Sequence, residues 1–95
     1  MHARVTRIQG DPATFDEVVR TITGSIVPGA KKMPGFKAGY WLYDRKTGKG
    51  LSLTVFESEA TMNSSEATAK QLRDSVDPGI SQITGVEHYE VVAQG

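Results

Sequence analysis

The sequence predicts a small α+β domain whose elements follow the order strand, helix, strand, strand, helix, strand. Three observations predict it. Apolar and polar residues alternate near the start of the chain, two stretches carry apolar residues at helical spacing, and the middle of the chain is typical of a β-hairpin. This order is that of a ferredoxin-like βαββαβ sandwich with a four-stranded antiparallel sheet. We expect a single domain over residues 1–95.

Composition excludes several function classes. Eleven basic and eleven acidic residues cancel, so no overall field attracts nucleic acid or an anionic membrane. No segment is apolar for the roughly 18 residues that a membrane-spanning helix needs. The chain has no cysteine and therefore no disulfide or thiolate metal site. We expect a cytoplasmic protein that binds neither nucleic acid nor membrane.

The first strand is predicted over His2–Gln9, where Ala3 and Val5 alternate with polar residues, and a helix follows. Two competing signals mark the start of this helix: Asp11 as a cap before Pro12, or a capping box over Thr14–Glu17. Its apolar stripe consists of Phe15, Val18, Val19, Ile22 and Ile26. Gly24 and Pro28 are expected to weaken or kink this helix, and Pro34-Gly35 to end it.

The hairpin is predicted from two segments rich in aromatic and branched residues, 34–43 and 51–56, joined by a basic, glycine-bearing turn over Asp44–Gly50. A second helix is expected from Ser58, its N-cap, to about Val76. Its stripe contains few large side chains: Met62, Ser65, Ala69, Leu72 and Val76. The last strand is predicted over Val86–Ala93.

The hairpin carries apolar side chains on both faces, whereas two helices can cover only one. If Tyr43 pairs with Leu51, one face is made of large residues that a second subunit would cover. The residues of this expected homodimer interface are Trp41, Tyr43, Leu51, Leu53 and Val55. The other face then carries Tyr40, Thr54 and Phe56 toward the helices. A register shifted by one residue would instead turn polar residues outward and leave a monomer.

The stretch from Pro34-Gly35-Phe36 through Asp44-Arg45-Lys46-Thr47-Gly48 to Phe56-Glu57-Ser58-Glu59 resembles the antibiotic biosynthesis monooxygenase-like family. The element order extends this resemblance over nearly the whole chain. The resemblance implies a dimeric α+β barrel, in which two sheets pack face to face with helices outside and a cleft lies between helices and sheet. Members of this family oxidise phenolic polyketides without metal or flavin, cleave haem, or have no established activity.

The haem-cleaving members of the family carry an Asn on the first strand, a Trp near the end of the third and a His on the second helix. The corresponding positions here hold Ala3, Phe56 and Glu66. Without a histidine on that helix the chain lacks the proximal iron ligand that haem needs. We therefore expect no haem, and no other cofactor or metal.

The candidate site residues follow from the predicted faces of the hairpin. Tyr40, Thr54, Phe56 and Met62 are expected to line a small-molecule pocket beneath the second helix, although core packing explains the aromatic residues equally well. His88 is the one histidine outside the N-terminus, and with Glu90 on the same strand face it is a candidate base. A half-exposed strand pair is the simpler interpretation of these two residues.

Two functions stay open. The first is a cofactor-independent monooxygenase acting on an electron-rich aromatic, for which an apolar pocket, a proton acceptor and an oxyanion-stabilising donor suffice. The second is a non-catalytic dimeric module that binds a ligand or a protein. An open cavity near His88 or Tyr40 favours the enzyme, and a filled interior favours the module.

Overall fold

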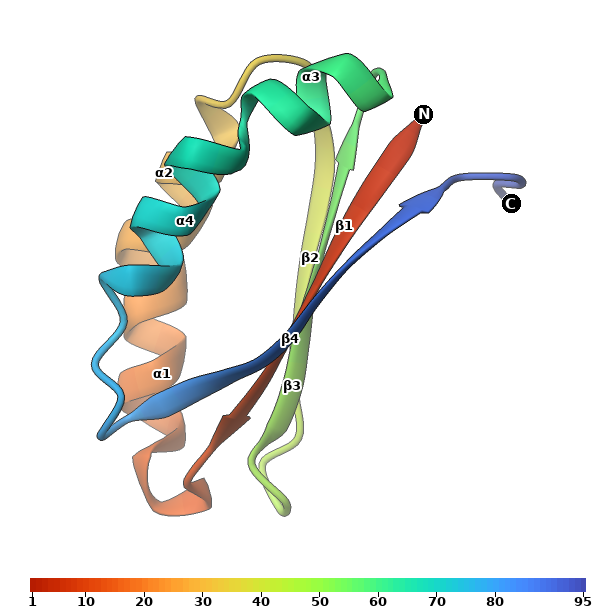
Figure 1. Ribbon diagram of the computed structural model, residues 1–95. Helices are drawn as coiled ribbons and strands as arrows, with labels where there is room; N and C mark the ends of the chain where they lie inside the picture. Colours follow the sequence, from red (N-terminus) through yellow and green to blue (C-terminus); the bar gives the residue numbers. More distant parts are fainter.

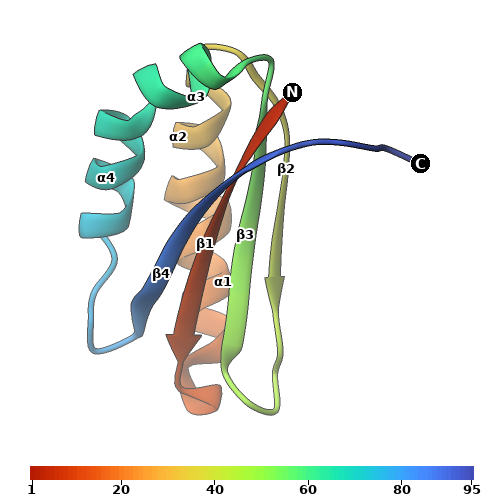
Figure 2. The ribbon, with the colours of Figure 1, turned by 45° about the vertical axis from the view of Figure 1, so that its right-hand side comes forward.

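Four antiparallel strands form one sheet in the order β2-β3-β1-β4. Figure 1 shows the computed structural model of residues 1–95, with all helices on one face of this sheet. The strands are β1 (His2–Gly10), β2 (Phe36–Tyr43), β3 (Lys49–Phe56) and β4 (Ser81–Glu90). Seen from the second direction, the opposite face is bare over its whole length (Figure 2). The predicted ferredoxin-like sandwich is confirmed.

The first helical region begins with a 3-10 turn and is interrupted once, by a π-helical segment. Asp11 caps a 3-10 turn, η1 (Pro12–Thr14), by accepting a hydrogen bond from the Ala13 amide, so the first of the two predicted start signals is the right one. The region continues as α1 (Phe15–Thr21), a π-helical segment η2 (Ile22–Ile26) and α2 (Val27–Lys31). Pro28 has no N–H to donate to the carbonyl of Gly24, and the wider π turn accommodates its ring without breaking the helix.

The second helical region begins at Ser58, as predicted, with a reciprocal capping box between Ser58 and Thr61. It is divided at Ser65 into α3 (Glu59–Ser64) and α4 (Glu66–Asp74). At the division, the Met62 carbonyl accepts a hydrogen bond from the Arg4 guanidinium on β1. A side chain of the sheet therefore takes the bond that a continuous helix would make.

The hairpin register differs by one residue from the predicted register. Tyr43 pairs with Gly50 rather than Leu51, and Trp41 pairs with Ser52. Because directly paired residues share a face, this shift moves Trp41 and Tyr43 to the helix side of the sheet and Tyr40 to the bare side. The glycines of the tight turn explain the shift, since Gly48 adopts a positive φ of 75° and places the strand start at Lys49.

β4 also differs from its predicted bounds, since it begins at Ser81 and ends at Glu90. An irregularity in its pairing with β1, between Arg7 and Ile8, allows its first part to continue the sheet. The earlier start escaped the sequence analysis because residues 81–85 carry little apolar alternation.

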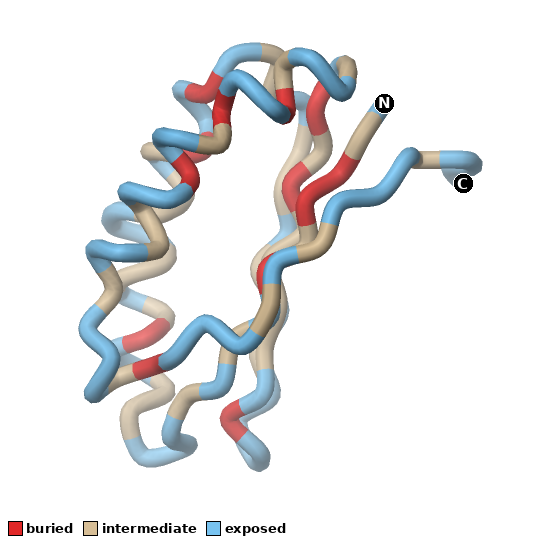
Figure 3. The backbone as a smooth tube through the Cα atoms, viewed as in Figure 1, coloured by how far each residue is buried: buried red, intermediate tan, exposed pale blue.

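The core lies mainly where α3 meets β1 and β3. Phe56 is fully buried, and Met62 and Ala30 are 2% exposed. Figure 3 shows the buried segments gathered there and becoming sparse toward the other end of the helices. Phe36, Trp41 and Leu72 pack against this core from its edge. The sparse packing beyond it leaves room between the two layers.

Candidate ligand cavity between the helices and the sheet

The space between the layers is a cavity of about 90 Å³. Its floor includes Trp41 and Thr54 of the sheet, and its walls include Ile22 and Ile26 of η2 and Leu72 of α4. Of the 21 lining residues 14 are hydrophobic, so the interior suits an apolar ligand rather than a sugar or a nucleotide. The volume is below the ~300–1,000 Å³ of typical ligand sites, so a ring system enters only if the helices move outward.

Trp41 reaches the cavity because Gly39 leaves space for its ring. A Cβ atom at Gly39 would lie 2.6 Å from Cη2 of Trp41, well inside van der Waals contact. The indole therefore lies along the strand over Gly39 and reaches the core residues. The chain contains one tryptophan, and it lies in the cavity wall.

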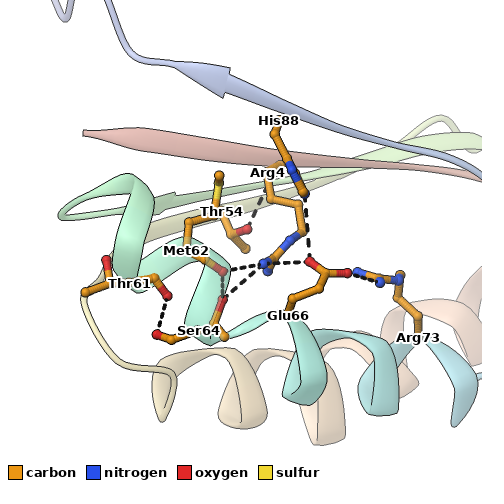
Figure 4. Close-up of polar contacts among 9 residues, drawn as sticks. Arg4, Thr54, Thr61, Met62, Ser64, Glu66, Arg73 and His88 are labelled. Atoms are coloured by element: carbon orange, nitrogen blue, oxygen red, sulfur yellow. Dashed lines mark hydrogen bonds and ion pairs between the residues drawn. The ribbon is translucent and has the colours of Figure 1, made fainter.

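A polar cluster closes one end of the cavity and is drawn in Figure 4. Thr54, Arg4 and His88 stand in one row across β3, β1 and β4, because Arg4 pairs with Thr54 on one side and with His88 on the other. From α4, Glu66 and Arg73 reach down to this row. The cluster thus joins three strands to the helix layer.

Glu66 stands at the centre of the cluster. Its Oε1 accepts a 2.6 Å hydrogen bond from Nη2 of Arg73, and its Oε2 lies 2.9 Å from Nη2 of Arg4. The contact with Arg4 is an ion pair without hydrogen-bond alignment. Nε2 of His88 lies 3.8 Å from the same Oε2. One carboxylate therefore pairs with two guanidinium groups and lies near an imidazole.

Arg4 is the most deeply buried charged residue of the cluster, with 3% of its surface exposed. Its Nη2 donates to the Met62 carbonyl and to Oγ of Ser65, and its guanidinium lies over the Phe56 ring. Burial lowers the pKa of Arg4, and the charge of Arg73 adds to this, although Glu66 acts in the opposite direction. Arginine is so basic that Arg4 stays charged at neutral pH.

The carboxyl group of Glu66 is shifted toward its ionised form. Burial raises the pKa of Glu66, but the hydrogen bond from Arg73 and the charges of Arg4, Arg73 and His88 outweigh burial. The net pKa of Glu66 lies below its usual value. Glu66 is therefore a fixed anion at neutral pH and a poor proton donor.

The structure separates the residues that the sequence suggested for the pocket. Thr54 lines the cavity, whereas Phe56 and Met62 are fully packed in the core beside it. Tyr40 is 63% exposed on the bare face, so the prediction that it faces the helices was wrong. The one-residue register shift accounts for this error.

His88 lies on the helix side, and its side chain is 44% exposed. Its carboxylate neighbour is Glu66 of α4 rather than the predicted Glu90, which pairs with His2 at the end of the sheet. His88 is not among the residues that line the cavity, whereas Arg4, its partner on β1, is. His88 stays a candidate proton acceptor, which would have to reach the cavity through a bridging water.

The interface residues predicted from the sequence fall on two different faces. Leu51, Leu53 and Val55 belong to the bare face, as expected. Trp41 and Tyr43 do not, because the register shift turns them to the helices, where Tyr43 stacks on Phe15 with the ring centroids 5.1 Å apart. Tyr40 and Leu42 occupy the bare face in their place.

Sequence reasoning missed the two arginines of the cavity. Arg4 was visible only as the polar half of an alternating strand, and a strand pattern does not say which half faces the helices. Glu66 and Arg73 are seven residues apart, two helical turns, which is a weak signal of a shared helix face. The cluster becomes apparent only when β1 is placed beneath α4.

Comparisons with known proteins were made for the sequence and for the structure. No protein-family model matches the sequence, and no curated protein matches it significantly. In structure, the chain is similar to a protein from Deinococcus radiodurans assigned to the antibiotic biosynthesis monooxygenases, with a TM-score of 0.78 and 12% identity over 99% of this chain and 95% of the other.

Two further similar structures contain bound molecules. One is the haem degrader MhuD from Mycobacterium tuberculosis with two haems in its active site, with a TM-score of 0.72 and 15% identity over 100% of this chain and 99% of the other. The other is the monooxygenase from the gene ActVA-Orf6 of Streptomyces coelicolor with nanaomycin D, with a TM-score of 0.68 and 18% identity over 99% and 88%. At such identities the likeness concerns the fold.

Proposed function

We propose a function that starts from the antibiotic biosynthesis monooxygenase-like fold of the chain, which the sequence resemblance implied. We propose that the protein binds a small aromatic molecule between its helices and its sheet and oxidises an electron-rich member of that class with dioxygen, without a cofactor. The observation that carries the proposal is the cavity itself, which is apolar over most of its wall and bordered at one end by two arginines. An apolar interior with a few polar groups at one end is the usual composition of a small-molecule site.

The chemistry requires little of the protein. A phenol and O2 become a quinone and water: the substrate supplies the electrons, one oxygen atom enters the ring, and the other leaves as water. The reaction begins with the substrate anion, which must lose its proton and be stabilised. The charges of Arg4 and Arg73 stabilise such an anion, and His88 accepts the proton through a bridging water. Exclusion of water by the apolar wall protects the intermediate.

Oxygen uptake tests the catalytic part of the proposal. Purified protein is incubated with a panel of phenols and anthrones under isotopically labelled O2, and the product is analysed for one labelled oxygen atom. We expect protein-dependent uptake that is reduced in His88→Ala. Because His88 is half-exposed, this variant should keep its free energy of unfolding within about 1 kcal/mol of the wild type. Glu57→Gln, an exposed change outside the cluster, is the matched control.

A second function is favoured by one specific observation. The only titratable side chains that line the cavity are the two arginines, so no base touches the ligand space directly. This arrangement suits a ligand-binding protein without catalysis. Tight binding of an aromatic with no oxygen uptake and no labelled product would contradict the oxygenase and establish the binding protein.

We also propose that the protein forms a homodimer through the bare face of the sheet. Tyr40, Leu42 and Tyr89 are each more than half exposed on this face, beside the less exposed Leu53 and Val55. A contiguous apolar surface of this kind is typical of an interface. A second copy of the chain that presents the same face is the simplest cover for this apolar surface. No helix of the chain is long and apolar enough to cross a membrane.

A further inference from the structure

Two guanidinium N–H groups beside the cavity lack a hydrogen-bond partner. They are Nε of Arg4 and Nη1 of Arg73, and both atoms are buried. Both residues line the cavity. Leaving a buried donor unpaired costs roughly 1–3 kcal/mol, so each of these two groups gains from a further acceptor.

The net charge of the cluster indicates the charge of the acceptor that it would bind. Arg4 and Arg73 contribute two positive charges and Glu66 one negative charge, which leaves one positive charge when His88 is neutral. No other charged residue lines the cavity. The remaining wall is largely apolar, which strengthens the attraction between a buried cation and a ligand anion.

Both guanidinium groups are held by neighbouring protein groups. The Arg4 guanidinium is held in place by the Met62 carbonyl, Oγ of Ser65 and the ring of Phe56. Arg73 is held by Glu66. The Arg4 guanidinium is therefore positioned before a ligand binds, and such preorganisation lowers the cost of binding. Charge-assisted hydrogen bonds of this kind are about twice as strong as neutral ones.

We propose that Arg4 and Arg73 select, among the aromatic ligands proposed above, those that carry an ionised oxygen, and that they bind this oxygen at the polar end of the cavity. The inference rests on the proposed function, because it uses the same cavity. The ring then lies along the apolar wall beside Trp41. A phenolate, an enolate and an aromatic carboxylate share this chemistry.

A pair of probes that differ mainly in charge tests the inference. Lawsone, a hydroxynaphthoquinone, is an anion at neutral pH, and its methyl ether is neutral and similar in shape. Binding is measured by calorimetry and by the fluorescence of Trp41, the single tryptophan, which lies in the cavity wall. We expect the anion to bind at least about tenfold more tightly, the equivalent of one hydrogen bond to a charged group.

Variants assign this preference to the cluster. Arg73→Met should remove the preference by weakening the anion about tenfold or more while leaving the neutral ether unchanged, since a charged hydrogen bond is lost. Arg20→Met, an exposed arginine of α1, should keep the wild-type values. Arg73 is the variant of choice because it is less buried than Arg4, and its thermal unfolding curve verifies that it is folded.

The outcomes separate this inference from the proposed function. Equal affinity for the two probes in the wild type, or a preference that survives in Arg73→Met, would overturn anion selection and leave the small-molecule site in place. No binding of either probe would overturn both. A preference that is lost in Arg73→Met and kept in Arg20→Met supports the inference.

Discussion

Arg4 connects the sheet, the helices and the cavity. It is a charged residue that is 97% buried only because three acceptors and an aromatic ring surround its guanidinium: the Met62 carbonyl, Ser65, Glu66 and Phe56. One of its donors still has no partner. Such an arrangement costs stability unless a ligand completes it, and residues of this kind are typical of functional sites.

Glu66 should make the protein sensitive to acid. The folded state holds its pKa below the usual value of 4.5, so folding favours the ionised carboxylate. The stability from this group is complete above the unfolded pKa and is lost as the pH falls through the lower folded pKa. We predict that the free energy of unfolding decreases less steeply with falling pH below about 4.5 in Glu66→Gln than in the wild type.

The Glu66 prediction is measured by urea unfolding at a series of pH values. Because the side chain is 40% exposed, solvent reduces the effect, and the slope rather than the absolute value is compared. Glu57→Gln, which removes an exposed carboxylate outside the cluster, should keep the wild-type slope. Identical acid slopes in wild type and Glu66→Gln would mean that the cluster does not hold Glu66 ionised.

At the scale of elements, both helical regions are irregular close to the cavity. The π segment η2 supplies Ile22 and Ile26 to its wall, and the division between α3 and α4 lies where Arg4 contacts the Met62 carbonyl. π segments and helix breaks are frequent at functional sites because they provide local freedom to move. The cavity is small, and these two places are where the helices can open to admit a ring.

The position of Trp41 over Gly39 can be tested by glycine substitution. Gly39→Ala places a Cβ atom 2.6 Å from the Trp41 ring, so the ring must move. We predict a loss of about 1–3 kcal/mol in the free energy of unfolding, as for overpacked cores, and a shift in tryptophan emission.

Gly24→Ala is the matched control, because its Cβ atom would meet nothing within 4 Å. In a helix this change should stabilise the protein by about 0.5–1 kcal/mol and leave the emission unchanged. If Gly39→Ala is neutral and spectrally silent, the indole does not lie over Gly39.

The order of the helices and strands was predicted from the sequence more successfully than the side of the sheet on which each hairpin residue lies. The order of strands and helices, the Ser58 cap and the stripe of the second helix were visible because they depend on local patterns, and Asp11 was one of the two caps considered for the first helix. The hairpin register was not, because it depends on one residue of the turn, and both faces of the hairpin are apolar. That single residue exchanged Tyr40 and Trp41 between the two faces.

The candidate site was predicted less well for the same reason. Thr54 lies on the helix side of the sheet, as predicted, whereas the arginines at the polar end of the cavity were not identified. A buried Arg4 looks like any polar strand residue until its partners on α4 are brought beside it. Contacts between residues about 60 positions apart in the chain leave no pattern in a single sequence.

At the scale of the whole molecule, the helices cover one face of the sheet and leave the other bare (Figures 1 and 2). We predict that light scattering gives twice the chain mass of 10.3 kDa at micromolar concentration. Tyr40→Lys, on the bare side of the edge strand β2, should shift the mass to that of one chain, because a buried unpaired charge is costly. Ala67→Lys, exposed on α4, should not.

A monomer mass for the wild type would contradict the interface. If Tyr40→Lys stays dimeric while folded, the two copies use another surface. Neither result bears on the cavity, which lies on the other side of the sheet and is formed by one chain.

The central claim is that a small aromatic molecule binds between the helices and the sheet with an oxygen at the two arginines. A crystal structure of the protein with lawsone tests it most directly. We predict density for the ring beside Trp41, an oxygen within hydrogen-bond distance of Arg4 or Arg73, and α1, η2 and α4 displaced outward from their present positions. A ligand bound on the bare face, or a cavity that stays empty and closed at saturating lawsone, would contradict the account.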